Sequence, residues 1–129
     1  MSNVPDGLLY TDDHEWIRVE GNVATVGITD HAQAGLGDIT FVELPQVGTE
    51  VARGDEACAV ESTKAAAGVN SPASGRIVEA NSALADDPGL INADPYGAGW
   101  IYKLELADAA ELAKLKSPEA YRQSLPSRK

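Results

Sequence analysis

Short stretches in which apolar and polar residues alternate run along the first half of the chain. Within residues 15–20, the apolar Ile17 and Val19 alternate with the charged Arg18 and Glu20, which is the period of a half-buried β-strand. Other runs of β-branched and apolar residues, bounded by turn residues, predict further strands. The predicted strands are residues 8–10, 15–20, 23–28, 39–44, 57–60, 76–81 and 100–106. Short strands joined by short turns indicate a mainly β protein with antiparallel sheets.

Helical signals are confined to short segments. Thr29 and Asp30 precede residues 31–34, and Gly35 follows them, which predicts one capped helical turn with a glycine stop. Further along, Pro88 suits the first position of another short helix.

Near the C-terminus the spacing of apolar residues changes from every second residue to every third or fourth residue. Asp108 with Glu111 three residues later predicts a capping box, and Ser117 followed by Pro118 predicts a second helix start. We therefore expect a C-terminal helical segment over about residues 108–125. Its apolar side chains, expected to pack on the β body, are Leu112, Leu115, Tyr121 and Leu125. The last three residues of the chain are expected to fray.

Lys64 stands within a run of small residues. The apolar residues 57–60 lead into this run and the turn-rich residues 71–75 follow it, so we expect a β-hairpin with Lys64 at its tip. Small neighbours would leave the ammonium group accessible to a modifying enzyme. Spacing alone does not separate an attachment site from an ordinary exposed lysine, because most lysines lie at the surface.

Composition and charge narrow the possible functions. With 129 residues, the chain has the length of a single domain, 1–129. A formal net charge of −10 excludes nucleic acid as an expected partner, because its phosphates would be repelled. The single Cys58 cannot form an internal disulfide, and no apolar run has the length of a membrane span. Because no signal or transit pattern is visible either, we expect a cytoplasmic protein of bacterial type without a membrane partner.

The candidate catalytic and metal-binding residues are few. His14 is expected to be structural, because two histidines and one cysteine are too few of the usual ligands for a zinc site. Cys58 lies in a run that should be buried, and no G-x-S-x-G motif is present. The chain is therefore expected to be a carrier rather than an enzyme, with its chemistry on an attached cofactor.

Several groups of residues resemble the H proteins of the glycine cleavage system. They are His14-Glu15-Trp16, residues 26–33 (VGITDHAQ), residues 36–38 (LGD), residues 61–66 (ESTKAA), residues 71–75 (SPASG) and residues 94–100 (DPYGAGW). The resemblance covers about residues 8–106, and several motifs in one order are more specific than any single one. Asn70 departs from the pattern, because many relatives have an aromatic residue there, and this bears only on local contacts beneath the hairpin.

The resemblance implies a fold, a cofactor and a role. The fold would be a lipoyl-domain-like barrel-sandwich hybrid of two antiparallel sheets with short helices and a lipoyl-binding core over about residues 23–105. Lys64 would carry lipoate in amide linkage. The chain would shuttle the aminomethyl group of glycine from a pyridoxal-phosphate decarboxylase to a tetrahydrofolate-dependent aminomethyltransferase, and then present the dihydrolipoyl arm for reoxidation. The partners implied are glycine dehydrogenase (decarboxylating), the aminomethyltransferase, dihydrolipoamide dehydrogenase and a lipoate-attaching enzyme.

Four acidic residues are candidates for supporting roles. Glu61 lies three residues before Lys64 on a strand, where it is either recognised by the lipoate-attaching enzyme or a solvated surface carboxylate. Glu15, Asp30 and Asp94 could shelter the loaded arm through charge-assisted hydrogen bonds to its cationic amine, although each could instead serve a cap or a turn.

Four alternatives stay open: a lipoyl relay that donates to 2-oxoacid dehydrogenases, a biotin carrier, a Schiff-base enzyme and an unmodified interaction module. Thr63 and Ala65 stand where a biotin carrier usually has methionines, which disfavours biotin. A Schiff-base lysine needs a lowered pKa, whereas Glu61 would favour the charged form of Lys64. An intact mass without an added group, from a host able to lipoylate, would favour the interaction module.

Overall fold

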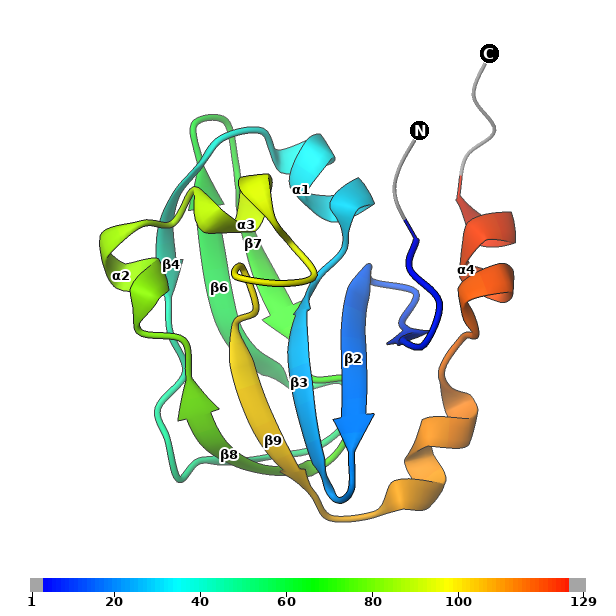
Figure 1. Cartoon of the computed structure of the whole chain (residues 1–129). Coiled ribbons are helices and arrows are strands. Elements are labelled where there is room, and N and C mark those ends of the chain that lie inside the picture. Colours follow the sequence, from blue (N-terminus) through cyan, green and yellow to red (C-terminus); the bar gives the residue numbers. More distant parts are fainter. Residues whose placement is uncertain (1–3, 126–129) are drawn as a thin grey trace.

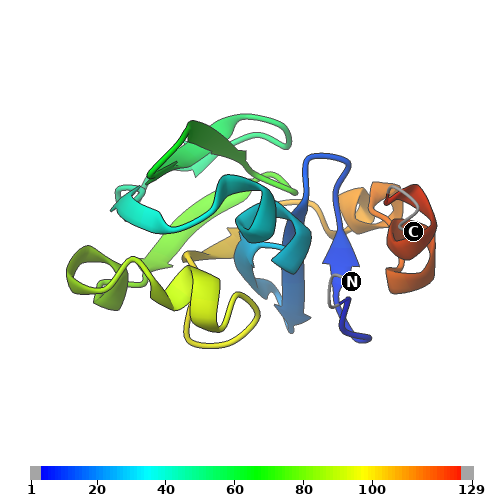
Figure 2. The same cartoon turned by 90° about the horizontal axis from the view of Figure 1, so that it is seen from above.

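The computed structural model describes residues 4–125, which form two layers of antiparallel sheet with short helices around them (Figures 1 and 2). The larger sheet has the strand order β1-β2-β3-β9-β8-β5, and the smaller has the order β4-β6-β7. The strands are β1 (Leu9–Tyr10), β2 (Glu15–Glu20), β3 (Val23–Ile28), β4 (Ile39–Glu43), β5 (Glu50–Val51), β6 (Glu56–Ser62), β7 (Ala66–Asn70), β8 (Gly75–Ala80) and β9 (Tyr102–Leu106). The predicted mainly β fold is confirmed, and the two sheets do not close into a barrel.

Five short helical segments connect or flank the strands. They are α1 (Asp30–Leu36), α2 (Ala83–Asp86), α3 (Leu90–Ala93), the 3₁₀ segment η1 (Ala109–Lys114) and α4 (Pro118–Ser124). In Figure 1, α2 and α3 lie on one side of the larger sheet, and η1 and α4 lie at the opposite edge beside β2.

The first hairpin follows from the alternating pattern. The register of β2 and β3 pairs Ile17 with Val26, and Gly21 closes the turn at a φ of 66°, a conformation that glycine adopts without a steric penalty. Ile17 and Val26 are both buried in the main core between the sheets. Trp16, which alternation places on the other face, is also fully buried, so this strand is covered on both sides.

A second, smaller core covers the outer face of β2. Tyr10 and Tyr121 stack with ring centroids 4.6 Å apart, and they pack with Trp16, Val4 and Leu8. Leu125 also packs against this cluster, whereas Leu112 and Leu115 pack against the main core. The prediction that the C-terminal segment packs on the β body is therefore confirmed.

Two predicted helix boundaries were wrong. Thr29 does cap α1, accepting a hydrogen bond from the amide of Ala32, but Gly35 lies inside the helix and Gly37 ends it at a φ of 82°. Pro88 is not the first residue of a helix, because α3 starts at Leu90. Both errors arise because a glycine or proline signals a nearby boundary without fixing its position.

The predicted capping box at the C-terminal segment was also wrong. Asp108 does accept a hydrogen bond from the amide of Ala110, but Glu111 does not reach back to Asp108. Its carboxylate instead accepts hydrogen bonds from the amide and hydroxyl of Ser74. A tertiary contact has replaced the local one, and the segment is a 3₁₀ helix. Ser117 and Pro118 start α4 as predicted.

Three further expectations from the sequence concern the last strand, membrane-spanning segments and the C-terminal end. The predicted strand over residues 100–106 begins at Tyr102. No helix among residues 4–125 is long and apolar enough to cross a membrane. The predicted fraying of the last three residues lies outside the described part of the chain.

Candidate functional site

The β6–β7 hairpin places Lys64 at an exposed tip. The register pairs Glu61 with Ala66, which leaves four residues for the turn. Ser62 closes it, because its amide donates to the carbonyl of Ala65 at 2.7 Å and its hydroxyl accepts from the amide of Ala65 at 3.0 Å. The lysine-tipped hairpin predicted from the sequence is therefore confirmed, with the Lys64 side chain exposed to solvent.

The connection between α1 and β4, residues 37–38, supports this tip. The amide of Thr63 donates to the carbonyl of Asp38 at 3.1 Å. Gly37 faces the stem of Lys64, because a Cβ atom built on this glycine would lie 3.5 Å from Cε of the lysine. In Figure 1 this connection runs beside the tip of the hairpin. The lysine thus leaves the protein from a turn that a second segment holds in place.

Glu61 lies on the exposed face of β6, close to the tip. It faces Phe41 of β4 across the register, and the Phe41 side chain is 53% exposed. The carboxylate of Glu61 and the ring of Phe41 therefore lie side by side at the surface near the lysine tip. This placement is open to a partner protein.

Glu15 lies at the opposite end of the hairpin, where it is 2% exposed. One carboxylate oxygen accepts from the hydroxyl of Thr11 at 2.6 Å, and the other accepts from the amide of Asn70, the last residue of β7, at 3.0 Å. Burial raises the pKa of Glu15 to about 7, against the lowering effect of these two hydrogen bonds. The side chain of Asn70 also donates to Asp13 at 3.2 Å, so its polar character is used at the base of the hairpin.

Asp30 and Asp94 have local structural roles. Asp30 begins α1, where its carboxylate accepts from the side-chain amide of Gln33 at 2.7 Å. Asp94 accepts from the amide of Ala98 at 3.0 Å and holds the turn before β9. The turn role that the sequence suggested is present at Asp94. At the start of α1 the capping side chain is that of Thr29, and Asp30 follows it in the first turn.

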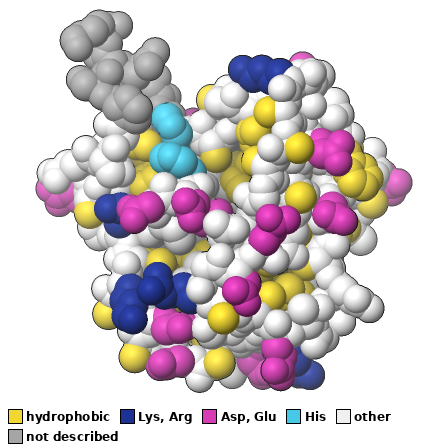
Figure 3. All heavy atoms as spheres, turned by 180° about the vertical axis from the view of Figure 1, so that it is seen from behind, with side chains coloured by type: hydrophobic (Ala, Val, Ile, Leu, Met, Phe, Trp, Pro, Cys, Tyr) yellow, Lys and Arg dark blue, Asp and Glu magenta, His cyan; other side chains and the backbone are white. Residues whose placement is uncertain are grey.

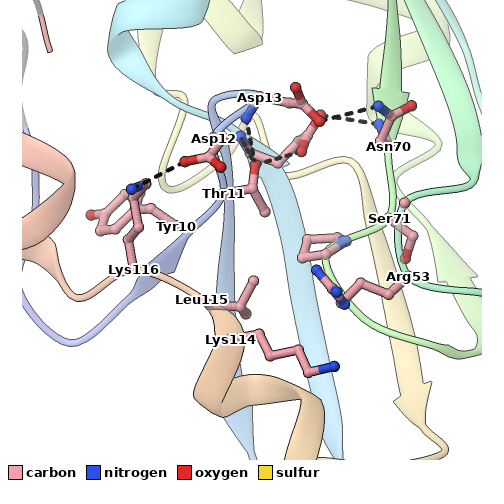
Figure 4. A pocket seen from close by; sticks show the side chains of 13 residues that line it. Tyr10, Thr11, Asp12, Asp13, Arg53, Asn70, Ser71, Lys114, Leu115 and Lys116 are labelled. Atoms are coloured by element: carbon pink, nitrogen blue, oxygen red, sulfur yellow. Dashed lines mark hydrogen bonds and ion pairs between the residues drawn. The ribbon is translucent and has the colours of Figure 1, made fainter. Parts of the chain in front are cut away.

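A hollow of about 170 Å³ opens beside Glu15 (Figure 4). Its walls are residues 10–13, the start of the segment after β7 and the end of η1. Arg53 and Lys114 extend toward it from opposite sides, and Lys116 is paired with Asp12 at 3.1 Å. The hollow is lined by charges of both signs. On the face drawn in Figure 3, acidic side chains are spread widely while the basic ones occupy few places.

Two residues with catalytic potential, His14 and Cys58, have structural explanations. His14 Nδ1 lies 2.8 Å from the hydroxyl of Tyr121, its ring packs against His31, and burial lowers its pKa. Within residues 4–125, no group of three or more His, Cys, Asp or Glu side chains could hold a metal ion. Cys58 is buried, and burial raises the pKa of its thiol to about 12. A buried neutral thiol is a poor nucleophile.

The chain is similar over most of its length to proteins of one family. A family model described as the glycine cleavage H-protein matches residues 8–128. The chain belongs to this family. The H protein of Methylocella silvestris is 60% identical over 112 residues, which are 87% of this chain and 90% of that protein. The H protein of Carboxydothermus hydrogenoformans is 51% identical over 125 residues, covering 97% of this chain and 96% of its own.

A solved structure shares the architecture of this H-protein family member. The crystal structure of a glycine cleavage system H protein from Mycobacterium marinum superimposes with a TM-score of 0.77 at 44% identity. The match covers 86% of this chain and 97% of that one. At this identity the likeness extends beyond the fold to the family.

Sequence reasoning missed the residues that support the lysine. Gly37 and Asp38 were noted only as part of the motif at residues 36–38. Nothing in that motif marked the Asp38 carbonyl as the acceptor for the Thr63 amide or Gly37 as a neighbour of the lysine stem. At the other end of the hairpin, the contact between Glu56 and Gly68 was also missed: a Cβ atom on Gly68 of β7 would collide with the Glu56 carboxylate. These contacts join different segments of the chain, and a sequence motif marked only the 37–38 connection.

Proposed function

We propose that this chain is the lipoyl carrier of a glycine cleavage system and that Lys64 is its attachment site. The single observation that carries the proposal is the position of Lys64 at the exposed tip of a closed hairpin, in a chain of the glycine cleavage H-protein family. We propose that the chain acts as a carrier subunit and that the chemistry takes place on the attached group. The chain presents a covalent group to other proteins.

The residues at the tip fit a lipoyl group. The amine of Lys64 is exposed and has no ion-pair partner among residues 4–125, so an enzyme can acylate it without breaking a contact. Acylation removes the positive charge. The bound lipoyl group would supply a redox-active dithiolane that accepts the aminomethyl group of glycine. The Gly37 backbone leaves room for the lysine stem where a larger residue would narrow it.

The partners follow from the role. We propose that glycine dehydrogenase (decarboxylating), the aminomethyltransferase and dihydrolipoamide dehydrogenase each receive the tip, and that a lipoate-attaching enzyme modifies it. The net charge of −10 favours basic docking surfaces on these proteins. We also propose a cytoplasmic location and a lipoyl-binding core over about residues 23–105 within one domain, 1–129.

Glu61 is proposed as a contact of the lipoate-attaching enzyme. Its support is its exposed position on the strand that leads to Lys64, one residue pair before the turn. For the loaded arm, we propose shelter by Glu15, Asp30 and Asp94. Glu15 has the strongest support, because it is buried at the end of β7 toward which an arm folded along the hairpin would point.

A lipoylation assay with a purified lipoate-attaching enzyme tests the attachment site. Wild-type protein should gain one lipoyl group on Lys64 by intact mass and peptide mapping, and Lys64→Arg should gain none. Lys64→Arg should unfold within about 0.5 kcal/mol of wild type, because an exposed tip residue contributes little to stability. A lipoyl group on another lysine would reject the assignment.

The same assay tests Glu61. Glu61→Ala should slow modification, whereas Glu43→Ala, which removes an exposed acid from the neighbouring strand β4, should not. Circular dichroism of both variants should match wild type. Equal rates for the two variants would show that Glu61 is an ordinary surface carboxylate.

A further inference from the structure

Asn92, on α3, makes a set of hydrogen bonds around the connection that supports the lysine tip. Its side-chain Nδ2 donates to the carbonyl of Gly37 at 2.8 Å, and its Oδ1 accepts from the amide of Ile39 at 2.8 Å. The second hydrogen of Nδ2 is donated to the side chain of Gln33 at 2.8 Å. One carboxamide therefore bonds the residues on both sides of Asp38.

These bonds fix the backbone group that holds the tip. The carbonyl of Asp38 accepts from the amide of Thr63, the residue before Lys64. The connection itself has little intrinsic rigidity, because Gly37 has a φ of 82° and a ψ of −155°, a region open essentially to glycine alone. Without the Asn92 side chain, the carbonyl of Gly37 and the amide of Ile39 would form hydrogen bonds with water instead. The Asp38 backbone between them would then lose its fixed orientation.

We propose that Asn92 is a positioning residue for Lys64, which acts through the 37–38 connection and sets how the lysine is presented to the lipoate-attaching enzyme. The inference rests on the proposed function for its enzymatic readout. The fixed connection keeps the tip in the form that the enzyme binds. Loosening it lowers the population of that form, and the apparent KM for the carrier rises in proportion while kcat stays the same.

Asn81 offers a matched control elsewhere in the fold. Its Nδ2 also donates to two groups, the carbonyls of Ala98 and Trp100, and its Oδ1 accepts from the amide of Ala83. It joins the start of α2 to the segment that precedes β9, and no bond from its side chain to the hairpin is present among residues 4–125. Substitutions at Asn81 therefore reproduce the loss of a bonded carboxamide without touching the support of the tip.

The test compares Asn92→Asp with Asn81→Asp, because each change keeps the shape and the acceptor and removes both donors. Amide exchange of Thr63, measured by NMR, should accelerate about tenfold or more in Asn92→Asp and stay at the wild-type rate in Asn81→Asp. Amides within β6 and β7 should exchange as in wild type in both variants. The KM for lipoylation should rise about tenfold only in Asn92→Asp.

A second pair, Asn92→Leu and Asn81→Leu, repeats the comparison without introducing a charge. If both Asn92 variants match their Asn81 partners in Thr63 exchange, the inference is overturned. If Thr63 exchange accelerates but KM does not change, Asn92 holds the tip, but the proposal that it positions Lys64 for the enzyme is overturned. If wild-type protein is never lipoylated, the proposed function fails, while Thr63 exchange still decides whether Asn92 holds the tip.

Discussion

Buried carboxyl groups bind protons more tightly than exposed ones, and Glu15 is such a group. The sequence places it on a strand whose alternation says nothing of its ionisation. In the fold it is 2% exposed and bonded to Thr11 and the backbone of Asn70. Burial raises its pKa from an ordinary 4.5 to about 7. A carboxyl group that is half ionised near neutral pH can both accept and release a proton at the base of the hairpin.

This pKa predicts a pH dependence of stability. Between about pH 4.5 and 7 the native state still holds the proton that the unfolded state has released, so the contribution of Glu15 is full below about 4.5 and is lost as the pH rises through about 7. The loss should reach about 3 kcal/mol, from about 1.4 kcal/mol per pKa unit. Urea unfolding of wild type and Glu15→Gln over this range should give curves that converge at acidic pH and separate as the pH rises, with wild type falling relative to the variant.

Glu20→Gln is the control for this measurement, because Glu20 is exposed at the end of β2 and lies away from any helix terminus. Its curve should follow wild type at every pH. If the difference between wild type and Glu15→Gln stays constant with pH, Glu15 ionises in the native state as it does in the unfolded chain.

At the scale of elements, the end of α1 decides how the hairpin tip is held. The helix continues through Gly35 and stops at Gly37, whose amide donates to the carbonyl of Gln33. Gly37 adopts a conformation that other residues avoid and lies against the stem of Lys64. The two glycines are two residues apart, yet one is replaceable and the other is not.

Alanine substitutions should separate the two glycines. Gly37→Ala should lower the free energy of unfolding by about 1–3 kcal/mol, because of its backbone conformation. Gly35→Ala should raise it by about 0.5–1 kcal/mol, because a Cβ there meets nothing within 4 Å and alanine favours the helix. Chemical denaturation of both variants measures these changes. Equal effects of the two substitutions would contradict the assignment of Gly37 as the helix stop.

At the scale of the whole molecule, the hairpin links two regions of different character. Its tip carries the exposed lysine and rests on the connection after α1, whereas its base is held by Glu15 and Asp13. The strand β7 between them has five residues, which span roughly 13 Å at about 3.3 Å for each step. A lysine extended by an acyl chain is long enough to reach from one region toward the other.

The proposed shelter can be tested on the intact protein. The aminomethyl group should decay more slowly on the lipoylated protein than on a lipoylated peptide of residues 61–68, because the peptide lacks Glu15, Asp30 and Asp94 and exposes the group to water. Decay is followed by the release of ammonia. Glu15→Gln should bring the rate on the protein closer to that on the peptide. If protein and peptide lose the group at the same rate, the fold gives no protection and the chain is a passive tether.

Much of the fold was predictable because its signals are local. Alternation between Ile17 and Val19, the glycine at Gly21 and the caps at Thr29 and Ser117 each act within a few residues. The tip position of Lys64 was predictable for the same reason, since small residues and turn formers surround it. The capping box failed where a long-range contact competed, because the carboxylate of Glu111 accepts from Ser74 and not from the backbone amide of Asp108.

By itself, the sequence determined the strands, the hairpin with Lys64 at its tip and the family. Periodicity, turn residues and motifs each depend on residues that are close together in the chain. Only the tertiary structure decided the raised pKa of Glu15, the contact of Gly37 with the lysine stem and the bonds of Asn92. Each of these joins residues from different elements. Their burial and their distances depend on how the two sheets and their connections pack, and no local pattern encodes that packing.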